Sequence, residues 1–306
     1  MRLQRGFEPS AGAGRAVAIG NFDGVHLGHQ QILAVLCGHG RESQSPTAVV
    51  CFEPQPKEYF AKGGAPARLM RLRDKAARIA EAGVDELRVL RFDARLARLD
   101  ADEFIQRVLV GALRARHVVI GEGFRFGHER RGDVALLRRA GSLHGFAVDA
   151  VAPRLDGGRP VSSTRVREAL AAGRMDEAKA LLGRDYRMSG RVVPGEKLGR
   201  TLGFPTANLR LHRRVSPVAG IFAVRVSGRG LVRHPGVASV GTRPTVDGRE
   251  WLLEVHAFDF EGDLYGERLD VDFIARLREE VRFPDLASMT RQMQDDAREA
   301  RRLLRP

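Results

Sequence analysis

The segment GNFDGVHLGHQ (residues 20–30) joins an apolar, strand-like run to a stretch with helical periodicity near residues 28–38. A tight loop from a strand into a helix gathers exposed backbone N–H groups and the positive end of the helix dipole at one point, where a phosphate can bind. His26 and His29 are three residues apart and share one face of this helix start. Gly28 between them lets a nucleotide approach the backbone closely. The segment therefore predicts a phosphate site, although two histidines that only cap or pack the helix remain an alternative.

The same alternation of strand and helix extends over the first half of the chain. Such alternation is typical of a parallel sheet with helices on its faces. Ligands of these sheets bind beyond the carboxyl ends of the strands, so we expect the site at the loops after Gly20, Phe52 and Gly121. The expected strands are residues 16–20, 47–52, 86–92, 117–121 and 146–151, and the expected helices lie near 28–38, 72–82, 101–114, 133–144, 166–173 and 175–183.

From about residue 187 the pattern changes to short strands separated by Gly and Pro turns, which indicates a small β-barrel or sandwich. After Pro284, apolar residues three and four apart predict a last helix that covers the barrel. We therefore expect an α/β domain over residues 1–184 and a β domain over residues 185–306. The expected strands of the β domain are residues 190–193, 221–226, 236–240, 250–258 and 268–275.

Length and composition agree with two folded domains. The 306 residues suffice for two hydrophobic cores. A composition of 43% hydrophobic and 29% charged residues excludes a disordered or fibrous protein.

No stretch approaches the roughly 20 apolar residues of a membrane span, and the N-terminal segment lacks the apolar part of a signal peptide, so we expect a cytoplasmic protein without a membrane partner. Cys37 and Cys51 lack the spacing of a disulfide framework or zinc site and are expected to be buried.

The net charge of +13, from 51 basic and 38 acidic residues, favours anionic partners such as nucleotides, nucleic acid or lipid headgroups. The arginines are dispersed rather than clustered, aromatic residues make up only 6%, and Trp251 is the single tryptophan. A nucleic-acid surface normally gathers its basic residues on one face or in a tail. We therefore expect no nucleic-acid partner, with an RNA- or DNA-binding module as the remote alternative.

A second set of candidate phosphate ligands lies in VSSTRVR (161–167), where an extended stretch meets a helix. Ser163 and Thr164 offer hydroxyl groups at the helix start, and Arg167 brings positive charge to the same end. A capped helix would explain these residues by themselves. Together with the histidine motif they indicate the two halves of a triphosphate clamp.

The segment GRVVPGEKLGRTLGFPTANL (190–209) holds a glycine-rich loop in which Gly195, Lys197 and Arg200 can bring N–H groups and charge to a phosphate. Further along, Thr206 and Asn208 lie two residues apart and thus on one side of an extended segment. A hydroxyl and an amide oxygen in this arrangement suit an Mg²⁺ ion that also binds ATP phosphates.

Residues 251–260 (WLLEVHAFDF), read as one strand, place Glu254 on the same face as Leu252, His256, Phe258 and Phe260. Apolar neighbours desolvate a carboxylate and raise its pKa, which makes it a better general base. An exposed glutamate on the polar face of an edge strand is the alternative.

Four motifs in order, GNFDGVHLGHQ, CFEPQPKEYF (51–60), GFRFGHERRGD (123–133) and VSSTRVREAL (161–170), resemble the adenylyltransferase half of the bifunctional bacterial riboflavin kinase/FAD synthetases. The segment 190–209, together with VGTRPTV (240–246), LEVHAFDFEGDLYG (253–266) and LREEVRF (277–283), resembles the kinase half. The resemblance implies a Rossmann-like nucleotidyltransferase domain followed by a six-stranded barrel.

The resemblance also implies roles for single residues. In the first domain, His26 and His29 would act on ATP, with Asn21 and Gly28 at the nucleotide. The implied phosphate ligands are Ser163, Thr164 and Arg167. In the barrel, Glu254 would be the general base and Thr206 and Asn208 would serve MgATP. The residues implied to lie near the flavin are Arg278, Glu280 and Phe283.

The implied reactions convert riboflavin and ATP to FMN and ADP, and then FMN and ATP to FAD and pyrophosphate, both with Mg²⁺. The FMN phosphate is already an anion, so the histidines would stabilise the transition state rather than remove a proton. Gly123 departs from the family, which usually has Asn or Asp there, and this leaves a riboflavin kinase with a weak adenylyltransferase as the nearest alternative. A nucleotidyltransferase with a regulatory barrel is another, and the sequence predicts no oligomeric state.

Overall fold

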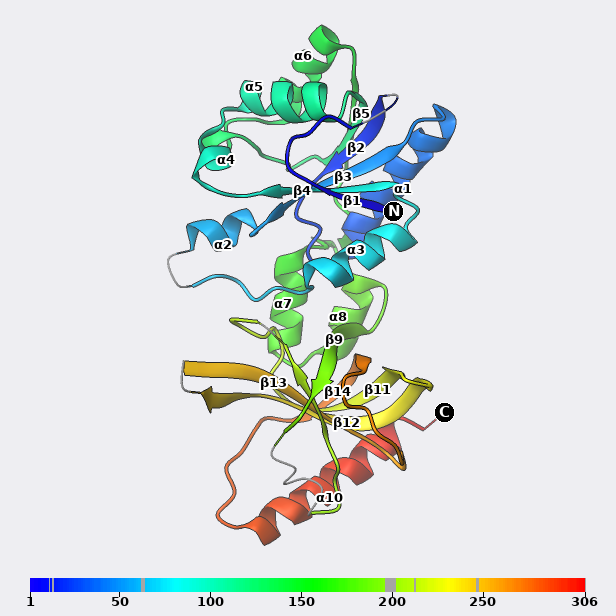
Figure 1. Cartoon of the computed structure of the whole chain (residues 1–306), viewed down its shortest axis with the longest axis vertical. Coiled ribbons are helices and arrows are strands. Elements are labelled where there is room, and N and C mark those ends of the chain that lie inside the picture. Colours follow the sequence, from blue (N-terminus) through cyan, green and yellow to red (C-terminus); the bar gives the residue numbers. More distant parts are fainter. Residues whose placement is uncertain are drawn as a thin grey trace. The chain divides into compact units, whose positions relative to one another are not determined.

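The computed structural model describes residues 1–10, 12, 14–61, 64–195, 202–211, 213–245 and 248–305. The chain forms two compact units (Figure 1). The first comprises Met1–Pro66 and Met70–Ser162, and the second comprises Ala67–Leu69 and Ser163–Pro306. By this division, the two helices after Ser162 group with the barrel, whereas the sequence analysis draws the boundary between residues 184 and 185.

The first unit is built on a six-stranded sheet in the order β1-β4-β3-β2-β5-β6, with every neighbouring pair parallel. All five residues of β2 are buried, as expected for a strand covered on both faces. The predicted α/β architecture is therefore confirmed. The strands are β1 (Arg2–Arg5), β2 (Arg15–Ile19), β3 (Thr47–Glu53), β4 (Glu86–Arg91), β5 (Ala115–Gly121) and β6 (Ala147–Val151).

The helices of this unit cover both faces of the sheet and enclose its core. The predicted helix near residues 101–114 consists of one α-helical turn that continues as a π-helix. Cys37 and Cys51 are buried as expected, and burial raises the pKa of both thiols. The helical segments are α1 (Leu27–Glu42), α2 (Pro56–Phe60), α3 (Leu72–Glu81), α4 (Ala94–Arg98), α5 (Ala101–Phe104), η1 (Ile105–Ala112), η2 (His128–Arg130) and α6 (Val134–His144), and a small hairpin follows as β7 (Leu155–Asp156) and β8 (Arg159–Pro160).

The second unit contains a closed antiparallel barrel in the order β10-β13-β12-β11-β14-β9, which confirms the predicted six-stranded barrel. Leu209, Leu253 and Val255 alternate with more exposed residues and fill the interior. The strands are β9 (Tyr186–Val193), β10 (Ala207–Arg210), β11 (Gly220–Gly228), β12 (Leu231–Thr245), β13 (Gly248–Ala257) and β14 (Arg268–Arg278).

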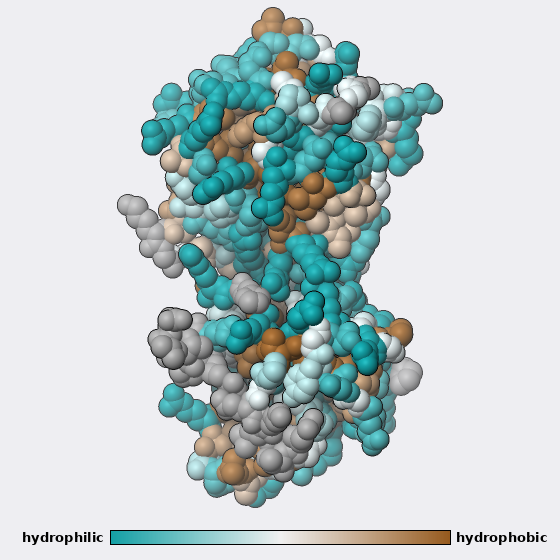
Figure 2. Space-filling model, viewed as in Figure 1, coloured by the Kyte–Doolittle hydropathy of each residue, from teal (hydrophilic) through white to brown (hydrophobic). Residues whose placement is uncertain are grey.

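Within the described ranges, three helices belong to this unit, namely α7 (Ser163–Ala171), α8 (Met175–Leu182) and α10 (Leu286–Leu303). As predicted, α10 covers the barrel, and its apolar stripe is most buried at Ala300 and the adjoining Leu304, which pack against Ala223 and Phe258. The face shown in Figure 2 is mostly hydrophilic, with apolar residues in small patches. None of the helices in the described ranges combines the length and apolar character needed to cross a bilayer.

Candidate active sites

The loop that follows β2 is held in a strained conformation by buried side chains. Phe22 and Val25 have positive φ angles of 47° and 40°, which non-glycine residues rarely adopt. Their side chains are only 1% and 3% exposed. Asp23 is buried as well, and its Oδ1 atom accepts a hydrogen bond from the backbone N–H of Met70 at 3.1 Å. Strain fixed in this way is typical of a functional loop.

His26 and His29 lie together at the start of α1, as predicted. His26 is the N-cap, and its Nδ1 atom accepts a hydrogen bond from the backbone N–H of His29 at 3.3 Å. The two rings stack with centroids 3.6 Å apart and an interplanar angle of 19°. Desolvation, followed by the charges of His26 and Lys75, lowers the pKa of His29 well below its ordinary value. His29 is therefore neutral near pH 7, and it can donate or accept a hydrogen bond but carries no charge.

Two buried polar atoms lie beside this helix start. Neither Asn21 Oδ1 nor His29 Nδ1 has a hydrogen-bond partner within the part of the chain that the structure describes. Buried polar atoms of proteins are nearly always paired, so both atoms are available to hydrogen-bond a ligand or a water molecule. The two residues belong to the set predicted from the sequence, and the structure brings them to one end of α1.

The structure shows a second reason for glycine at position 28, which the sequence alone did not reveal. A Cβ atom at this position would lie 3.3 Å from Nδ1 and Cε1 of the His26 ring and 3.4 Å from the carbonyl oxygen of Val161. Any larger residue would thus push the imidazole out of place, in addition to hindering a nucleotide. Glycine at position 28 therefore leaves the His26 ring in its present position.

Lys75 is a candidate site residue that sequence reasoning missed. It lies on α3, its side chain is 1% exposed, and its charge acts on both His29 and Cys51. Buried lysines are rare in proteins. Helical periodicity alone predicts a lysine at a surface position, so only the fold could identify it.

An aromatic cavity of about 940 Å³ opens in the first unit beside the ends of β3 and β4. Its volume falls within the range of small-molecule and cofactor sites. The cavity is lined by residues of two motifs that the sequence analysis quoted but did not assign to individual roles. The aromatic lining residues are Phe52, Tyr59, Phe60, Phe92, Phe104, Phe124 and Phe126, and the cationic ones include Lys57, Arg98, Arg125 and Arg130.

Gly123 lies in the turn after β5, directly before Phe124. A Cβ atom built on it meets no atom within 4 Å. Packing around the Cβ position therefore does not require glycine here.

The predicted phosphate ligands of the segment 161–167 lie in the second unit, at the start of α7. Ser163 and Thr164 form the first residues of the helix. Nε of Arg167 donates a hydrogen bond to the carbonyl oxygen of Ala67 at 2.6 Å, which fixes the direction of the guanidinium group.

Thr206 and Asn208 flank the start of β10. The Oδ1 atom of Asn208 is buried and has no hydrogen-bond partner in the described ranges, and its Nδ2 atom makes a weak bond of 3.5 Å to the Thr206 carbonyl. Gly195 lies directly against this side chain, because a Cβ atom there would overlap the Asn208 amide. Lys197 and Arg200 lie outside the described residues.

Glu254 lies on β13, opposite Asn208 of β10 on one side and Ser239 of β12 on the other. Ser239 in turn lies opposite Ile221 of β11, and Ile221 lies opposite Arg278 of β14, so these residues form one row across the strands. Opposite residues of adjacent strands share one face of the sheet. The barrel thus aligns the predicted metal ligand, general base and flavin residue on its outer face.

The predicted surroundings of Glu254 need one correction. Leu252 and His256 share its face, but β13 ends at Ala257, so Phe258 and Phe260 lie beyond the strand. Phe258 is 1% exposed and packs instead against α10. The turn that begins at Phe258 takes these two residues out of the alternation along β13.

Glu280 and Arg278 both have partners. Ser239 Oγ donates to Glu280 Oε1 at 3.3 Å, which places this carboxylate beside the same row. Arg278 binds Asp296 of α10 in a bidentate manner, with Nη2–Oδ2 and Nε–Oδ1 distances of 2.7 and 3.0 Å. Its guanidinium carbon lies 5.6 Å from the centroid of the Phe283 ring. Arg278 thus also attaches β14 to α10.

A second cavity, of about 490 Å³, adjoins this region. It lies between the segment before Thr206, the end of β13 and α10. His256 contributes to its wall, and the Nδ1 atom of this residue lies 2.9 Å from the carbonyl oxygen of Pro205.

Comparison with known proteins covers both units. Residues 8–165 match the family model for FAD synthetase, and residues 182–304 match the model for riboflavin kinase. The chain is 47% identical over 304 residues to the bifunctional riboflavin kinase/FMN adenylyltransferase of Escherichia coli, which covers 98% of this chain and 97% of that protein. The protein of the same name from Pseudomonas fluorescens is 49% identical over 296 residues and covers 96% and 94%.

Among solved structures, one from Streptococcus pneumoniae described as a macrolide-efflux protein superposes with a TM-score of 0.84 at 31% identity, covering 98% of both chains. The two halves match separate family models, and the relatives align with nearly their whole length. The chain therefore belongs to the family of bifunctional riboflavin kinase/FMN adenylyltransferases.

Proposed function

We propose that the two reactions of this enzyme use two separate sets of residues, one at the start of α1 and one on the outer face of the barrel. The enzyme phosphorylates riboflavin to FMN with ATP and then adenylylates FMN to FAD with release of pyrophosphate. The proposal rests on one observation, namely that each place holds a buried polar atom without a partner in the described ranges, Asn21 Oδ1 and His29 Nδ1 in one unit and Asn208 Oδ1 in the other.

In adenylyl transfer, an oxygen of the FMN phosphate attacks the α-phosphorus of ATP, the bond to the bridging oxygen breaks, and pyrophosphate leaves. The attacking oxygen is already ionised, so no proton must be removed. His26, His29 and the N–H groups at the start of α1 then stabilise the charge that develops on the α-phosphate. The lowered pKa of His29 supports hydrogen bonding as its role. Lys75 supplies the positive charge that the neutral imidazole lacks.

The aromatic cavity of the first unit is proposed to bind the flavin ring of FMN. Flat aromatic walls suit an isoalloxazine ring, and the cationic lining residues suit the phosphate. For Ser163, Thr164 and Arg167 we propose that the hydroxyl groups and the oriented guanidinium bind a phosphate group of ATP. The hydrogen bond from Arg167 to Ala67 supports this role because it orients the side chain before a ligand binds.

In phosphoryl transfer, Glu254 accepts the proton of the ribityl 5′-hydroxyl, the freed oxygen attacks the γ-phosphorus of ATP, and ADP leaves. Thr206 and Asn208 would hold Mg²⁺, and the unpartnered Oδ1 atom of Asn208 suits a hard cation. When bound, Mg²⁺ neutralises the phosphate charge. Gly195, Lys197 and Arg200 are proposed to contact the ATP phosphates. The flavin is proposed to lie near Arg278, Glu280 and Phe283.

The test separates the two sites in one protein. Purified enzyme with riboflavin, ATP and Mg²⁺ should form FMN before FAD in a chromatographic time course. Glu254→Gln should stop FMN formation and leave the conversion of added FMN to FAD intact, and His29→Ala should do the reverse. Loss of both activities in a folded single variant would contradict two separate sites.

A further inference from the structure

Two imidazoles and a carboxylate meet in the first unit, at the opposite end of α1 from the catalytic histidines. His39 lies in the last turn of α1, His117 on β5 and Asp149 on the edge strand β6. Thirteen residues separate His26 from His39, so at a rise of 1.5 Å per residue they lie about 20 Å apart along the helix. This cluster has no part in the reactions described above.

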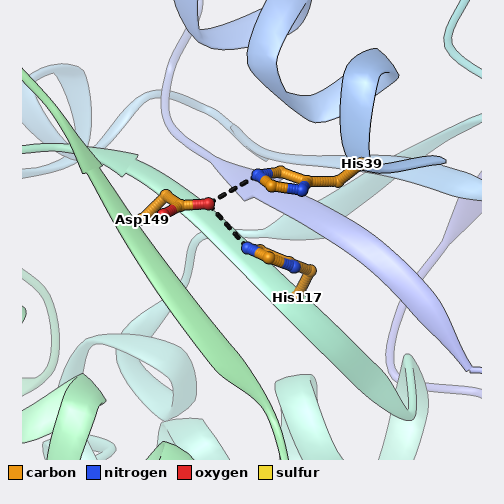
Figure 3. A group of neighbouring side chains, drawn as sticks. All are labelled: His39, His117 and Asp149. Carbon is orange, nitrogen blue, oxygen red and sulfur yellow. Dashed lines mark hydrogen bonds and ion pairs between the residues drawn. The ribbon is translucent and has the colours of Figure 1, made fainter. Parts of the chain in front are cut away.

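The three side chains point toward one another (Figure 3). The Nε2 atoms of His39 and His117 lie 2.5 and 2.6 Å from the same atom, Oδ2 of Asp149. The two rings stack with centroids 3.6 Å apart and an interplanar angle of 18°. One ligand atom from each residue lies within 4.8 Å of the others. Three potential ligand atoms from distant parts of the sequence thus lie close together, with both ring nitrogens beside one carboxylate oxygen.

We infer that this cluster binds a transition-metal ion of the Zn²⁺ type. Imidazole nitrogen and carboxylate oxygen are common zinc ligands at about 2.0–2.2 Å, which places ligand atoms of a tetrahedral site roughly 3.3 Å apart. The two nitrogen–oxygen distances need to widen by less than about 1 Å to reach that spacing. An ion accepts electron pairs from both imidazoles and the carboxylate, and it replaces the two protons that now join the rings to one oxygen.

The surroundings of the cluster support this assignment. The side chains of His39 and His117 are 25% and 24% exposed and that of Asp149 is 45% exposed, so an ion can enter and a water molecule can complete the coordination. Glu42 Oε2 lies 3.7 Å from Nδ1 of His39, on the far side of the ring from the cluster. This distance is too long for a hydrogen bond, but the Glu42 carboxylate adds negative charge near a bound cation.

A bound ion would join the end of α1 to β5 and β6. We therefore expect it to stabilise the first unit without taking part in group transfer. Sequence spacing alone does not reveal this site, because its ligands lie 78 and 32 residues apart, far from any short metal-binding motif.

The test is a titration of chelator-treated full-length enzyme, without nucleotide, with Co²⁺ followed by visible absorption and then with Zn²⁺ in competition. We expect one Co²⁺ per chain with the absorption of a tetrahedral ion, displaced by Zn²⁺. Loss of a residue that only hydrogen-bonds to a zinc ligand typically lowers metal affinity 10–100-fold. His117→Ala and Asp149→Asn remove a ligand itself, so each should lower the metal affinity by at least about 100-fold. His144→Ala is the matched control, because this imidazole pairs with Gln106 outside the cluster.

Thermal unfolding gives a second readout. Zn²⁺ should raise the unfolding temperature of the unaltered enzyme and of His144→Ala, but not that of Asp149→Asn, whose side chain keeps its shape and should preserve the fold. The inference is overturned if no ion binds, if Asp149→Asn binds it as tightly as the unaltered enzyme, or if His144→Ala weakens binding equally.

Discussion

Replacement of Gly28 by alanine tests the geometry of the adenylyl site most directly. The added Cβ atom would lie 3.3 Å from the His26 ring and 3.4 Å from the Val161 carbonyl oxygen, so the imidazole must shift by a few tenths of an ångström. A displacement of 1 Å at a catalytic site can cost about 100-fold, and a shift of this smaller size should cost about tenfold in kcat/KM for FAD formation, or about 1.4 kcal/mol. FMN formation should not change, because its residues lie in the other unit.

Gly38→Ala is the matched control for this experiment. It adds the same methyl group to the same helix, but the new Cβ atom meets nothing within 4 Å. Alanine favours a helix over glycine by about 1 kcal/mol, so this variant should be at least as stable as the unaltered enzyme and fully active. The assay follows FAD from added FMN and FMN from riboflavin in parallel. If Gly28→Ala formed FAD as fast as Gly38→Ala, or lost both activities to the same extent, the argument from the His26 ring would be refuted.

Three further predictions concern the two sites. Glu254→Gln should lower FMN formation by at least about 100-fold, the usual contribution of a general base, while FAD formation from added FMN should stay unchanged; an active variant in a riboflavin kinase assay would remove Glu254 from this role. The lowered pKa of His29 means that the folded state resists protonation of this residue. The stability of the protein should therefore fall as pH decreases below about 6.5, where the unfolded chain takes up the proton. Between pH 5 and pH 8 the unfolding temperature should depend less steeply on pH in His29→Gln, and an equal dependence would contradict the burial argument. Gly123→Asn restores the side chain usual in the family at a position where an added Cβ atom meets nothing within 4 Å, and it should increase kcat/KM for FAD formation because it supplies the missing amide; an unchanged value would contradict this expectation.

Local patterns predicted the elements of both units well, because alternating and helical periodicities reflect which residues are buried. The strand β1 escaped prediction, since its four residues RLQR lie at the sheet edge and are mostly exposed. The aromatic cavity was also not predicted, because residues from several loops meet there only after the sheet has formed.

In the two proposed sites, too, residues close in sequence could be grouped from the sequence, whereas residues brought together by the fold could not. His26, His29 and Gly28 lie within one turn, so their proximity follows from spacing alone. The alignment of Glu254 with Ser239 depends on strand register, which spacing does not determine. The role proposed for Lys75 depends on its burial in the fold, so the sequence alone could not predict it either.

The strained loop at Phe22 and Val25 has an evolutionary consequence. These residues are both core side chains and the backbone of the proposed adenylyl site, so a substitution that repacks the core around them also moves the imidazoles. On the barrel, by contrast, Leu253 and Val255 face the interior while Glu254 faces outward. Mutations can therefore accumulate in the barrel interior with less effect on the proposed kinase residues, whereas the first unit must change its core and its proposed site together.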